Sequence, residues 1–431
     1  MSFPRVLPVG DSALTVELGD TLSPATNARV RSLERDLARA PFEGFREAVP
    51  GHRSLLVLFD PRAVRRASLG GDLVSRAANV AEAPATGRLH EVAVSYGGEC
   101  GPDLTHLARS RGISEAEVIR LHASVEYAVF MLGFMPGFAY LGLLPEALEA
   151  PRLATPRVRV PAGSVAVAGR QAGVYPVASP GGWRLLGRTS RRLFDPFRTQ
   201  PALFAPGDRV RFVPVAELPP DEPESRLPRP SAGAVVEVLE AGLLTTVQDA
   251  GRSGHRRVGV SSAGPMDARA FAAANRAVGN PADAAALECT MTGPALAFRA
   301  PLRFAVAGAD LGAVLERADL GAWPVPRGAS VLARPGNVLR FTGRRSGCRA
   351  YVALSGGIDV PLVIGSRATD LPSAFGGLAG RPLAAVACRL RCAAARYRSS
   401  IRTASKRTSP SPGTSWARSG RSAVSTVAIF G

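Results

Sequence analysis

The stretch from Val129 to Pro196 constrains the fold more than any other part of the chain. Glycine or proline interrupts each short apolar run in FMLGFMPGFAYLG, PRVRVPAGSVAVAGRQAGVYPVASPGGWRLLGRTS and LFDP. This punctuation excludes a long helix and predicts short strands joined by tight turns, closing into a barrel or a sandwich. Glycine and proline occur mainly because turns require them, so the alternative is a β-domain with no catalytic or binding site. Its few polar residues, together with backbone N–H groups at the turns, are candidates for a site. They are Arg157, Gln171, Tyr175, Ser179, Trp183, Arg188 and Asp195.

The length of 431 residues suits two or three domains with buried cores. The five cysteines are irregularly spaced and include no CxxC pair, which argues against a disulfide framework or zinc site and for a reducing compartment. The N-terminus does not follow the signal-peptide pattern, and no run reaches the roughly 18 apolar residues of a membrane span. We therefore expect a cytoplasmic protein without a membrane partner.

The formal net charge of +18 would by itself favour a nucleic-acid partner. However, ten basic residues and no Asp or Glu follow Asp370, which leaves 43 basic against 35 acidic residues for the rest of the chain. That remainder contains no dense basic helix and no aromatic platform motif. We therefore expect no binding of nucleic acid.

The first 85 residues are predicted to form a small α/β subdomain. Short strands within 3–18 precede a helix that Ser23 caps and Pro24 begins. Strands follow at 44–49 and 54–59, and a second helix at about 61–80 completes a β-β-α-β-β-α order.

A β-barrel is predicted for residues 86–217. It begins with a strand at 89–95, and a helix capped by Ser114 and Glu117 follows. Glu99 is either a solvated turn residue or an acid that faces a substrate. The proline-rich, polar stretch 218–233 is typical of a linker between domains. A second module starts near Val235 and contains a helix predicted from Asp267 to about Val278.

The motifs of the first module resemble a known family. GFMPGFAYLG, PR-x-RVPAGSVA, Q-x-GVYP, SPGGWRLLGRT and LFDP, in this order, resemble the B subunit of bacterial 5-oxoprolinase. The same family includes the first half of the carboxyltransferase part of urea carboxylase and a sporulation-kinase inhibitor.

The second module resembles the C subunit of 5-oxoprolinase. The match rests on GLLTTVQD-x-GR, G-x-MD, VGNP-x-DAAALE, GADLGA, SGGIDVP and GSRATDL, between residues 234 and 383. The chain thus resembles a fusion of the B and C subunits. The resemblance implies a mostly β, α+β fold with tandem cyclophilin-like β-barrel domains.

The resemblance to the C subunit stops near Leu383, so we expect a truncated second module. Residues 384–431 are rich in Arg, Ala, Ser and Pro and lack carboxylates, which indicates a frameshift near codons 383–386 and predicts a disordered basic tail. A basic tail for an acidic partner is the functional alternative. A frameshift predicts little or no activity for the chain as written.

The sequence lacks the motifs of several common kinds of active site. There is no G-x-x-x-x-G-K-[ST] phosphate loop, no HExxH, no clustered His and Cys, and no G-x-S-x-G elbow. There is also no A-M-K-M-like carrier lysine. We expect no metal site of clustered ligands and no biotin attached to this chain.

The resemblance implies a component of 5-oxoprolinase, which opens 5-oxoproline to glutamate with ATP, used with Mg²⁺, and with a separate A subunit as partner. It leaves a homo-oligomer open. The carboxyltransferase part of urea carboxylase and an inhibitor of a histidine kinase are the alternative functions.

The candidate site residues are the polar positions within the matched motifs. Arginines suit a substrate carboxylate, and amide and hydroxyl groups suit an oxyanion or amide; rim salt bridges are the alternative role of each arginine. Arg170 and Ala172 depart from the Gly and Thr of the family pattern beside Gln171. Candidate catalytic residues are Glu99, Gln171, Tyr175, Asp249 and Asp267; candidate substrate-binding residues are Arg157, Ser179, Trp183, Arg188, Gln248, Arg252 and Glu288.

Overall fold

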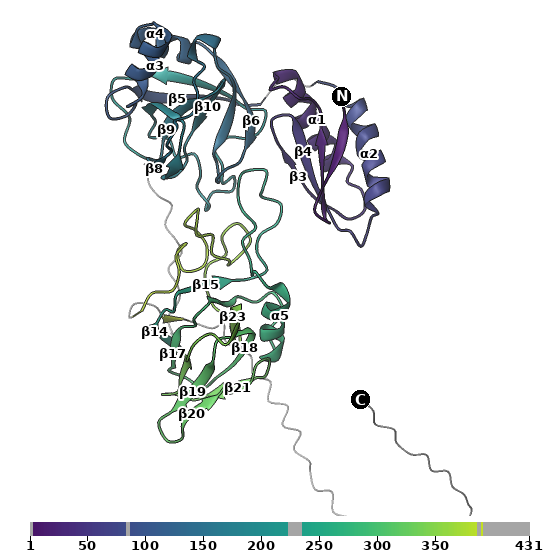
Figure 1. The fold of residues 1–431 in the computed structure, drawn as a ribbon, viewed down its shortest axis with the longest axis vertical. Coiled ribbons are helices and arrows are strands. Elements are labelled where there is room, and N and C mark those ends of the chain that lie inside the picture. The colour runs from purple at the N-terminus through teal and green to yellow at the C-terminus, as the bar shows by residue number, and fades with distance from the viewer. Residues whose placement is uncertain (1–2, 83–86, 223–234, 386–388, 391–431) are drawn as a thin grey trace, which may run out of the picture. The chain divides into compact units, whose positions relative to one another are not determined.

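The computed structural model describes residues 3–82, 87–222, 235–385 and 389–390. All of them belong to one compact unit, residues 1–394. This part of the chain consists mostly of strands and contains five α-helices, so the expected mostly β, α+β class is confirmed (Figure 1). None of its helices is long and apolar enough to cross a membrane.

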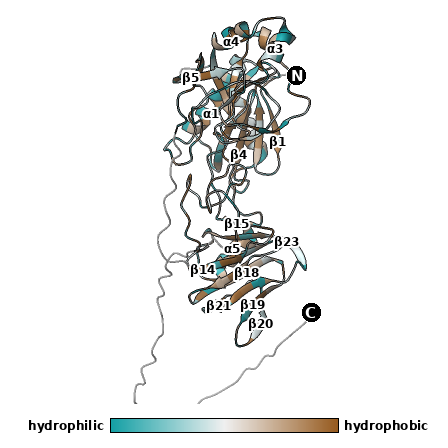
Figure 2. Ribbon diagram, turned by 90° about the vertical axis from the view of Figure 1, so that its left-hand side faces the viewer, coloured by the Kyte–Doolittle hydropathy of each residue, from teal (hydrophilic) through white to brown (hydrophobic). Residues whose placement is uncertain are grey.

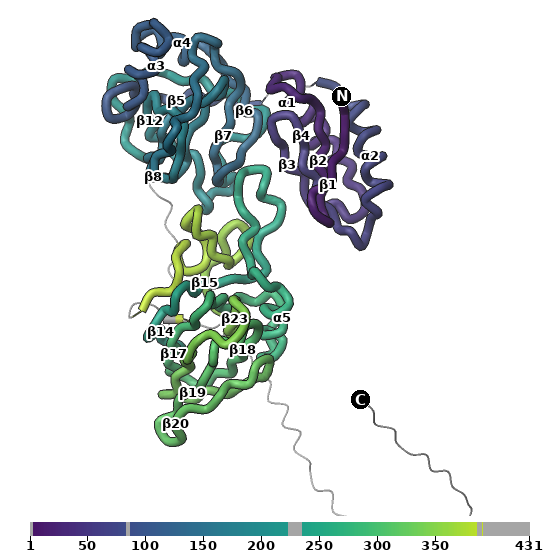
Figure 3. The backbone as a smooth tube through the Cα atoms, viewed as in Figure 1, coloured from purple at the N-terminus to yellow at the C-terminus, as the bar shows by residue number. Residues whose placement is uncertain are grey.

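The N-terminal subdomain, residues 3–82, has the element order expected from the sequence. β1 (Arg5–Val9), β2 (Ala13–Glu17), β4 (Ser54–Phe59) and β3 (Phe45–Pro50) form an antiparallel sheet in that spatial order. α1 (Pro24–Arg39) and α2 (Arg66–Asn79) pack against it through a shared apolar core (Figure 3). The Ser23 hydroxyl accepts the N–H of Thr26 and caps α1, as predicted.

The next module contains a closed barrel of seven strands. The spatial order is β10 (Gln171–Val174), β7 (Ala139–Leu143), β6 (Glu126–Leu132), β13 (Arg209–Pro214), β5 (Leu89–Tyr96), β12 (Arg184–Arg188) and β9 (Ser164–Ala168). β9 pairs with β10 and closes the ring, and β5 and β13 are parallel. Valine and leucine side chains from these strands fill the interior.

Smaller elements surround the barrel: α3 (Leu104–Arg111), α4 (Glu115–Ala123), the 3-10 helix η1 (Glu146–Leu148), and the paired strands β8 (Arg157–Val160) and β11 (Ser179–Gly181). Ser114 caps α4 by accepting the N–H of Glu117. His122 on α4 is fully buried, stacks on Phe212 with 4.6 Å between ring centroids, and has Nδ1 2.7 Å from the Tyr96 hydroxyl. Burial lowers the pKa of His122 to about 3.

The second module consists of two sheets around one core. One sheet has the order β20 (Gly321–Pro324), β19 (Ala313–Arg317), β22 (Val338–Phe341), β17 (Ala295–Phe298), β14 (Val236–Glu240) and β24 (Arg389–Leu390). The other has the order β15 (Leu244–Gln248), β16 (Ala286–Thr290), β23 (Ser346–Leu354), β18 (Leu302–Asp310) and β21 (Val331–Ala333). α5 (Ala268–Ala277) packs on β18 and β23. Hydrophobic residues concentrate on the strands (Figure 2).

Two irregular segments of the second module contact the first. They are residues 249–264, which we call the junction loop, and residues 355–385. Val260, Val363 and Phe375 from these segments are buried in the same apolar cluster as the barrel core. Gly137 also donates its N–H to the Val258 carbonyl at 3.0 Å. The two modules therefore share part of one core.

Gly259 in the junction loop fits a position where a side chain does not. Its φ is +80°, and an added Cβ would lie 2.4 Å from the Met135 carbonyl oxygen. The same loop reaches the N-terminal subdomain, where Arg256 pairs with Glu47 at 2.9 Å and Arg257 with Glu34 at 2.9 Å. Desolvation raises the pKa of Glu34, and Arg257 opposes that rise.

The expected domain boundaries at 85, 217, 233 and 383 stay predictions. Most of the expected linker and of the expected tail lies outside the described residues, namely 223–233, 386–388 and 391–431.

Candidate functional site

A cavity of about 480 Å³ lies where the two modules meet, and we call it the junction pocket. The first module contributes the β6–β7 loop and the turn that enters β11. The second module contributes the junction loop and the 355–385 segment. The lining residues are Phe134, Met135, Pro136, Ala178, Ser179, Pro180, Gly259, Ser261, Asp370, Pro372 and Ser373.

Ser179 is the predicted site residue that lines this pocket. Its side chain is only 7% exposed, and its hydroxyl finds no hydrogen-bond partner in the described part of the protein. A buried hydroxyl without a partner costs about 1–3 kcal/mol. The Ser179 hydroxyl is therefore available to hydrogen-bond a molecule that enters the pocket.

Opposite the first module, Asp370 and Ser261 form a fixed pair. The Ser261 hydroxyl donates to Asp370 Oδ2 at 2.8 Å, and the N–H of Ser373 donates to Oδ1 at 3.3 Å. Asp370 is buried, yet it lines the cavity. A carboxylate held in this way is positioned to accept an N–H from a bound amide.

Arg252 places a buried positive charge near this carboxylate. The side chain is 3% exposed, donates Nη2 to the Ala368 carbonyl, and lies over the Phe375 ring at 4.9 Å from its centroid. Desolvation lowers the pKa of Arg252, while Asp370 and Asp249 act in the opposite direction. Arg252 does not line the pocket itself, so its contribution is electrostatic.

An aromatic cluster supports the first-module wall. Phe134 lines the cavity, is 62% exposed and has an unusual φ of +67°. Beneath it, Phe138 contacts Tyr175 and Trp183 edge-on, at centroid distances of 5.1 and 5.6 Å. Tyr175 and Trp183 are buried, and desolvation raises the pKa of Tyr175. They therefore support the wall rather than line the pocket.

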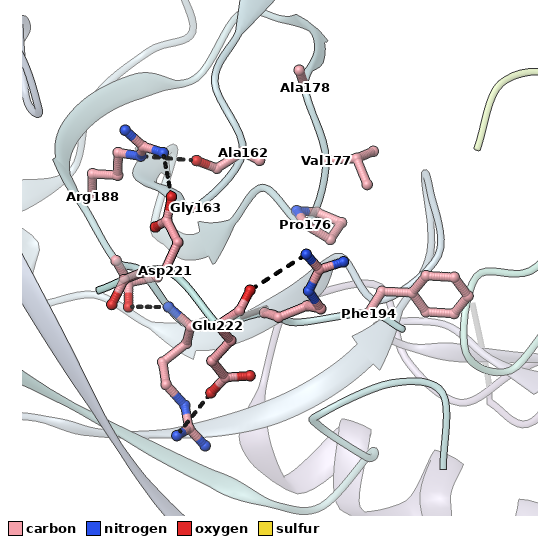
Figure 4. A pocket seen from close by; sticks show the side chains of 13 residues that line it. Ala162, Gly163, Pro176, Val177, Ala178, Arg188, Phe194, Asp221 and Glu222 are labelled. Atoms are coloured by element: carbon pink, nitrogen blue, oxygen red, sulfur yellow. Dashed lines mark hydrogen bonds and ion pairs between the residues drawn. The ribbon is translucent and has the colours of Figure 1, made fainter. Parts of the chain in front are cut away.

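A second cavity, of about 360 Å³, adjoins the first, and we call it the arginine pocket. Both cavities are lined by Ala178. Arg188, predicted to bind substrate, lines the arginine pocket, donates Nε to the Ala162 carbonyl at 3.2 Å and lies 4.0 Å from Asp221 (Figure 4). Arg191, Arg192 and Glu222 line it as well.

Three other predicted residues of the first module lie outside both cavities. Arg157 donates to Asp103 at 2.8 Å, and Asp103 also accepts the Leu185 N–H. Gln171 lies 2.8 Å from a ring nitrogen of His52, whose pKa burial lowers. Glu99 is exposed in the turn that follows β5. The structure therefore does not bring together Arg157, Gln171, Tyr175 and Arg188 as a single pocket lining.

The predicted residues of the second module hold the pocket-forming loops. Gln248 accepts the N–H of Gly264 and donates to the Thr369 carbonyl at 3.3 Å. Asp249 accepts from the N–H of Gly251, the Ser366 hydroxyl and the N–H of Arg367. These bonds connect β15 to the junction loop and to the 355–385 segment, which carry Ser261 and Asp370 into the pocket.

Asp267 and Glu288 position α5. Asp267 caps the helix by accepting the N–H groups of Arg269 and Ala270. Glu288 Oε2 accepts the N–H of Met266 and the hydroxyl of Tyr351, each at 2.7 Å. Neither carboxylate lines the two cavities.

Comparison with known proteins assigns the chain to a family. Residues 4–204 match the carboxyltransferase domain, subdomain C and D, and residues 258–422 match the carboxyltransferase domain, subdomain A and B. The chain is 45% identical to the 5-oxoprolinase B subunit of Escherichia coli O157:H7 over 214 residues, 48% of this chain and 95% of that protein. The chain belongs to the family of 5-oxoprolinase B subunits.

The C-terminal part of this B-subunit family member matches other relatives. It is 41% identical over 150 residues to the 5-oxoprolinase C subunit of Escherichia coli K12, covering 35% of this chain and 46% of that protein. The chain thus spans about half the length of that second relative. The crystal structure of TTHA0988 matches with a TM-score of 0.76 at 38% identity, covering 89% of this chain and 75% of that chain. The predicted resemblance to the B and C subunits is confirmed.

Three residues that line the junction pocket were not predicted from the sequence: Phe134, Ser261 and Asp370. Asp370 lies in GSRATDL and Phe134 in FMLGFMPGFAYLG, both of which are matched motifs. The matched motifs could therefore have pointed to Phe134 and Asp370 as candidate site residues. However, no local spacing shows that residues separated by more than two hundred positions line one cavity.

Proposed function

We propose that this chain is a component of a 5-oxoprolinase and that the junction pocket binds 5-oxoproline. One observation carries the proposal: the pocket takes its lining from both modules, and each module resembles one subunit of 5-oxoprolinase. Activity with ATP and with a separate A subunit of the enzyme belongs to this proposal.

Each polar group of the pocket has a proposed role. The Ser179 hydroxyl hydrogen-bonds the lactam carbonyl, and Asp370, held by Ser261, accepts the lactam N–H. Arg188 in the adjoining arginine pocket binds the substrate carboxylate. The buried positive charge of Arg252 favours negative charge that develops on the lactam oxygen. Catalytic roles for Glu99, Gln171, Tyr175, Asp249 and Asp267 stay predictions.

The reaction needs an activated amide. Transfer of the γ-phosphoryl group of ATP to the lactam oxygen releases ADP and leaves a carbon that water attacks. The C–N bond then breaks, phosphate leaves, and glutamate forms. No group of three or more His, Cys, Asp and Glu within the described residues could hold a metal ion, so we derive no step through Mg²⁺.

Carboxyl transfer is the second candidate function, because both matched families are carboxyltransferase subdomains. The C-terminal part also matches the urea amidolyase of Lachancea kluyveri at 40% identity over 148 residues, 34% of this chain and 8% of that protein. This function would need a biotin carrier on another chain. A cytoplasmic location stays a prediction that cell fractionation would test.

Calorimetry of the full chain, mixed with the A subunit of 5-oxoprolinase, tests the proposal by binding, which does not depend on turnover. We expect the Ser179→Ala and Arg188→Ala variants to bind 5-oxoproline about tenfold more weakly than the wild type, since each loses one hydrogen bond or ion pair to substrate. Ser330→Ala is the matched control, because its hydroxyl is also buried with no hydrogen-bond partner among the described residues but lies outside both pockets. Wild-type binding of urea but not 5-oxoproline would favour carboxyl transfer.

The predicted loss of activity is a separate question. The match to subdomain A and B runs to residue 422, beyond Leu383, where the resemblance to the C subunit stopped. Turnover of 5-oxoproline should be compared between the chain as written and a chain whose reading frame is restored near codon 384. Equal rates, or no acidic continuation in the other two frames of the DNA, would contradict the frameshift.

A further inference from the structure

Closely packed backbone forms the floor of the arginine pocket. Gly163 has a φ of +79°, and a Cβ added there would lie 2.1 Å from the Thr189 carbonyl oxygen. Gly163 donates its N–H to the Tyr175 carbonyl at 2.7 Å and accepts the N–H of Thr189 at 2.9 Å. The segment that follows β12 is thereby held in place, and Arg188, Arg191 and Arg192 line the cavity from it.

The arginines of this segment outnumber its acids. Between residues 188 and 198 the chain has four arginines and one acid, Asp195. Asp195 is buried; its Oδ1 accepts the N–H of Phe197, and its Oδ2 lies 3.5 Å from Arg198 Nε. Further negative charge comes from Asp221 and Glu222, which follow β13 and line the same cavity.

The Glu222 carboxylate lies between two guanidinium groups. Its Oε1 is 3.1 Å from Arg191 Nη1, and its Oε2 accepts from Arg198 Nη2 at 2.9 Å. The Glu222 backbone carbonyl lies 3.5 Å from Arg192 Nη2. This is the geometry in which paired arginines bind a carboxylate or phosphate. Figure 4 shows Glu222 among the residues that line the pocket.

Solvent reaches these ion pairs. The Arg191 and Arg198 side chains are 46% and 40% exposed, and that of Asp221 is 75% exposed. Exposed ion pairs contribute little to stability, so another oxyanion can replace Glu222 at small cost. The shared lining residue Ala178 places such an anion beside the junction pocket.

We propose that the arginine pocket is a binding site for a soluble oxyanion, either a phosphate group or a carboxylate, and that Glu222 occupies it as an internal competitor. The carboxylate alternative rests on the proposed function, in which Arg188 of this pocket binds the substrate carboxylate, whereas the phosphate alternative does not. It predicts that a ligand must displace Glu222 from Arg191 and Arg198.

Titration calorimetry of the full chain at low salt tests this with two probes, pyrophosphate and 5-oxoproline. Glu222→Gln should bind one probe about three- to tenfold more tightly than the wild type, since two exposed ion pairs no longer compete. Arg191→Gln, placed in the Glu222→Gln background, should lose at least that gain. Glu217→Gln is the matched control. It removes the same charge from an exposed residue that, like Glu222, follows β13, and this variant should behave as the wild type.

The two probes distinguish the sources of the anion. Tighter binding of pyrophosphate alone assigns the pocket to phosphate, and tighter binding of 5-oxoproline alone assigns it to a carboxylate. The proposal is overturned if neither probe binds any variant, or if Glu222→Gln and Glu217→Gln have equal affinities. A chain that fails to bind 5-oxoproline but shows the Glu222 effect with pyrophosphate would contradict the proposed function and leave this inference standing.

Discussion

The two modules differ in how they complete their sheets. In the first, seven strands close into a ring, so each strand has two neighbours. In the second, among the described residues, β15 and β21 end one sheet, and β20 and β24 end the other. A closed barrel satisfies its strand edges internally, whereas open sheets depend on what covers them.

The same difference appears in the polar residues of the matched motifs. In the first module, Ser179 and Arg188 line cavities. In the second module, Gln248 and Asp249 bond to loop backbone. We conclude that Ser179 and Arg188 reach the two cavities from strands of the first module, whereas Ser261 and Asp370 reach the junction pocket on loops of the second module that Gln248 and Asp249 hold in place.

The most severe test of this comparison separates the modules. Residues 1–215 expressed alone should unfold cooperatively in urea, because the barrel closes without the second module. Residues 235–431 alone should not, since Val260, Val363 and Phe375 would lose the barrel core on which they pack. Circular dichroism and urea titration of both fragments would measure this.

In the intact chain, limited proteolysis should cut between Leu218 and Gly233, and preferred cleavage inside 129–196 would contradict the boundary.

Substitution at the contact between the modules should have the next largest effect. Gly259→Ala should destabilise the second module by about 4 kcal/mol, since it combines an unfavourable φ with a clash against backbone that cannot move freely. Gly254→Ala is the matched control, because Gly254 has a φ of +81° but nothing within 4 Å of an added Cβ. It should cost only about 1 kcal/mol. Equal losses in urea unfolding would show that the contact carries no stability.

Removing one loop anchor should be less severe. Asp249→Ala leaves three donors without their acceptor, those of Gly251, Ser366 and Arg367, and should cost about 3 kcal/mol. Because these loops carry Ser261 and Asp370, ligand affinity of the junction pocket should fall as well. Asp283→Ala, an exposed change in the same module, should alter neither property. Unchanged thermal unfolding of Asp249→Ala would contradict the anchoring role.

The smallest predicted effect concerns the barrel alone and depends on pH. The pKa of His122 is about 3 in the folded state and about 6.5 when unfolded, so the unfolded state binds more protons between these values. Stability is therefore complete above pH 6.5 and falls as the pH decreases towards 3. At pH 5 the loss should be about 2 kcal/mol. Urea unfolding of residues 1–215 at pH 7 and pH 5 measures it, and His122→Phe, which cannot titrate, should lose less.

The sequence predicted local structure well where local chemistry decides it. Ser23 and Ser114 cap the predicted helices, and Asp267 caps a helix at the predicted place. Which residues come together in a site was harder to predict from the sequence. Arg157 was predicted to bind the substrate carboxylate, but it forms an ion pair with the largely buried Asp103. Gln171 bonds to His52, which lies 119 residues earlier in the chain. Such pairings depend on tertiary packing, which spacing along the chain does not reveal.

The junction pocket has a consequence for how this protein responds to dilution. Its two walls lie on either side of residues 218–233 of one chain, so they meet by an intramolecular event. The linker predicted at these residues would give an effective concentration in the millimolar range, as short tethers typically do. Two unlinked proteins would separate when diluted below their dissociation constant, and their pocket would separate with them. In this fused chain the fraction of assembled pockets should be the same at nanomolar and at micromolar protein.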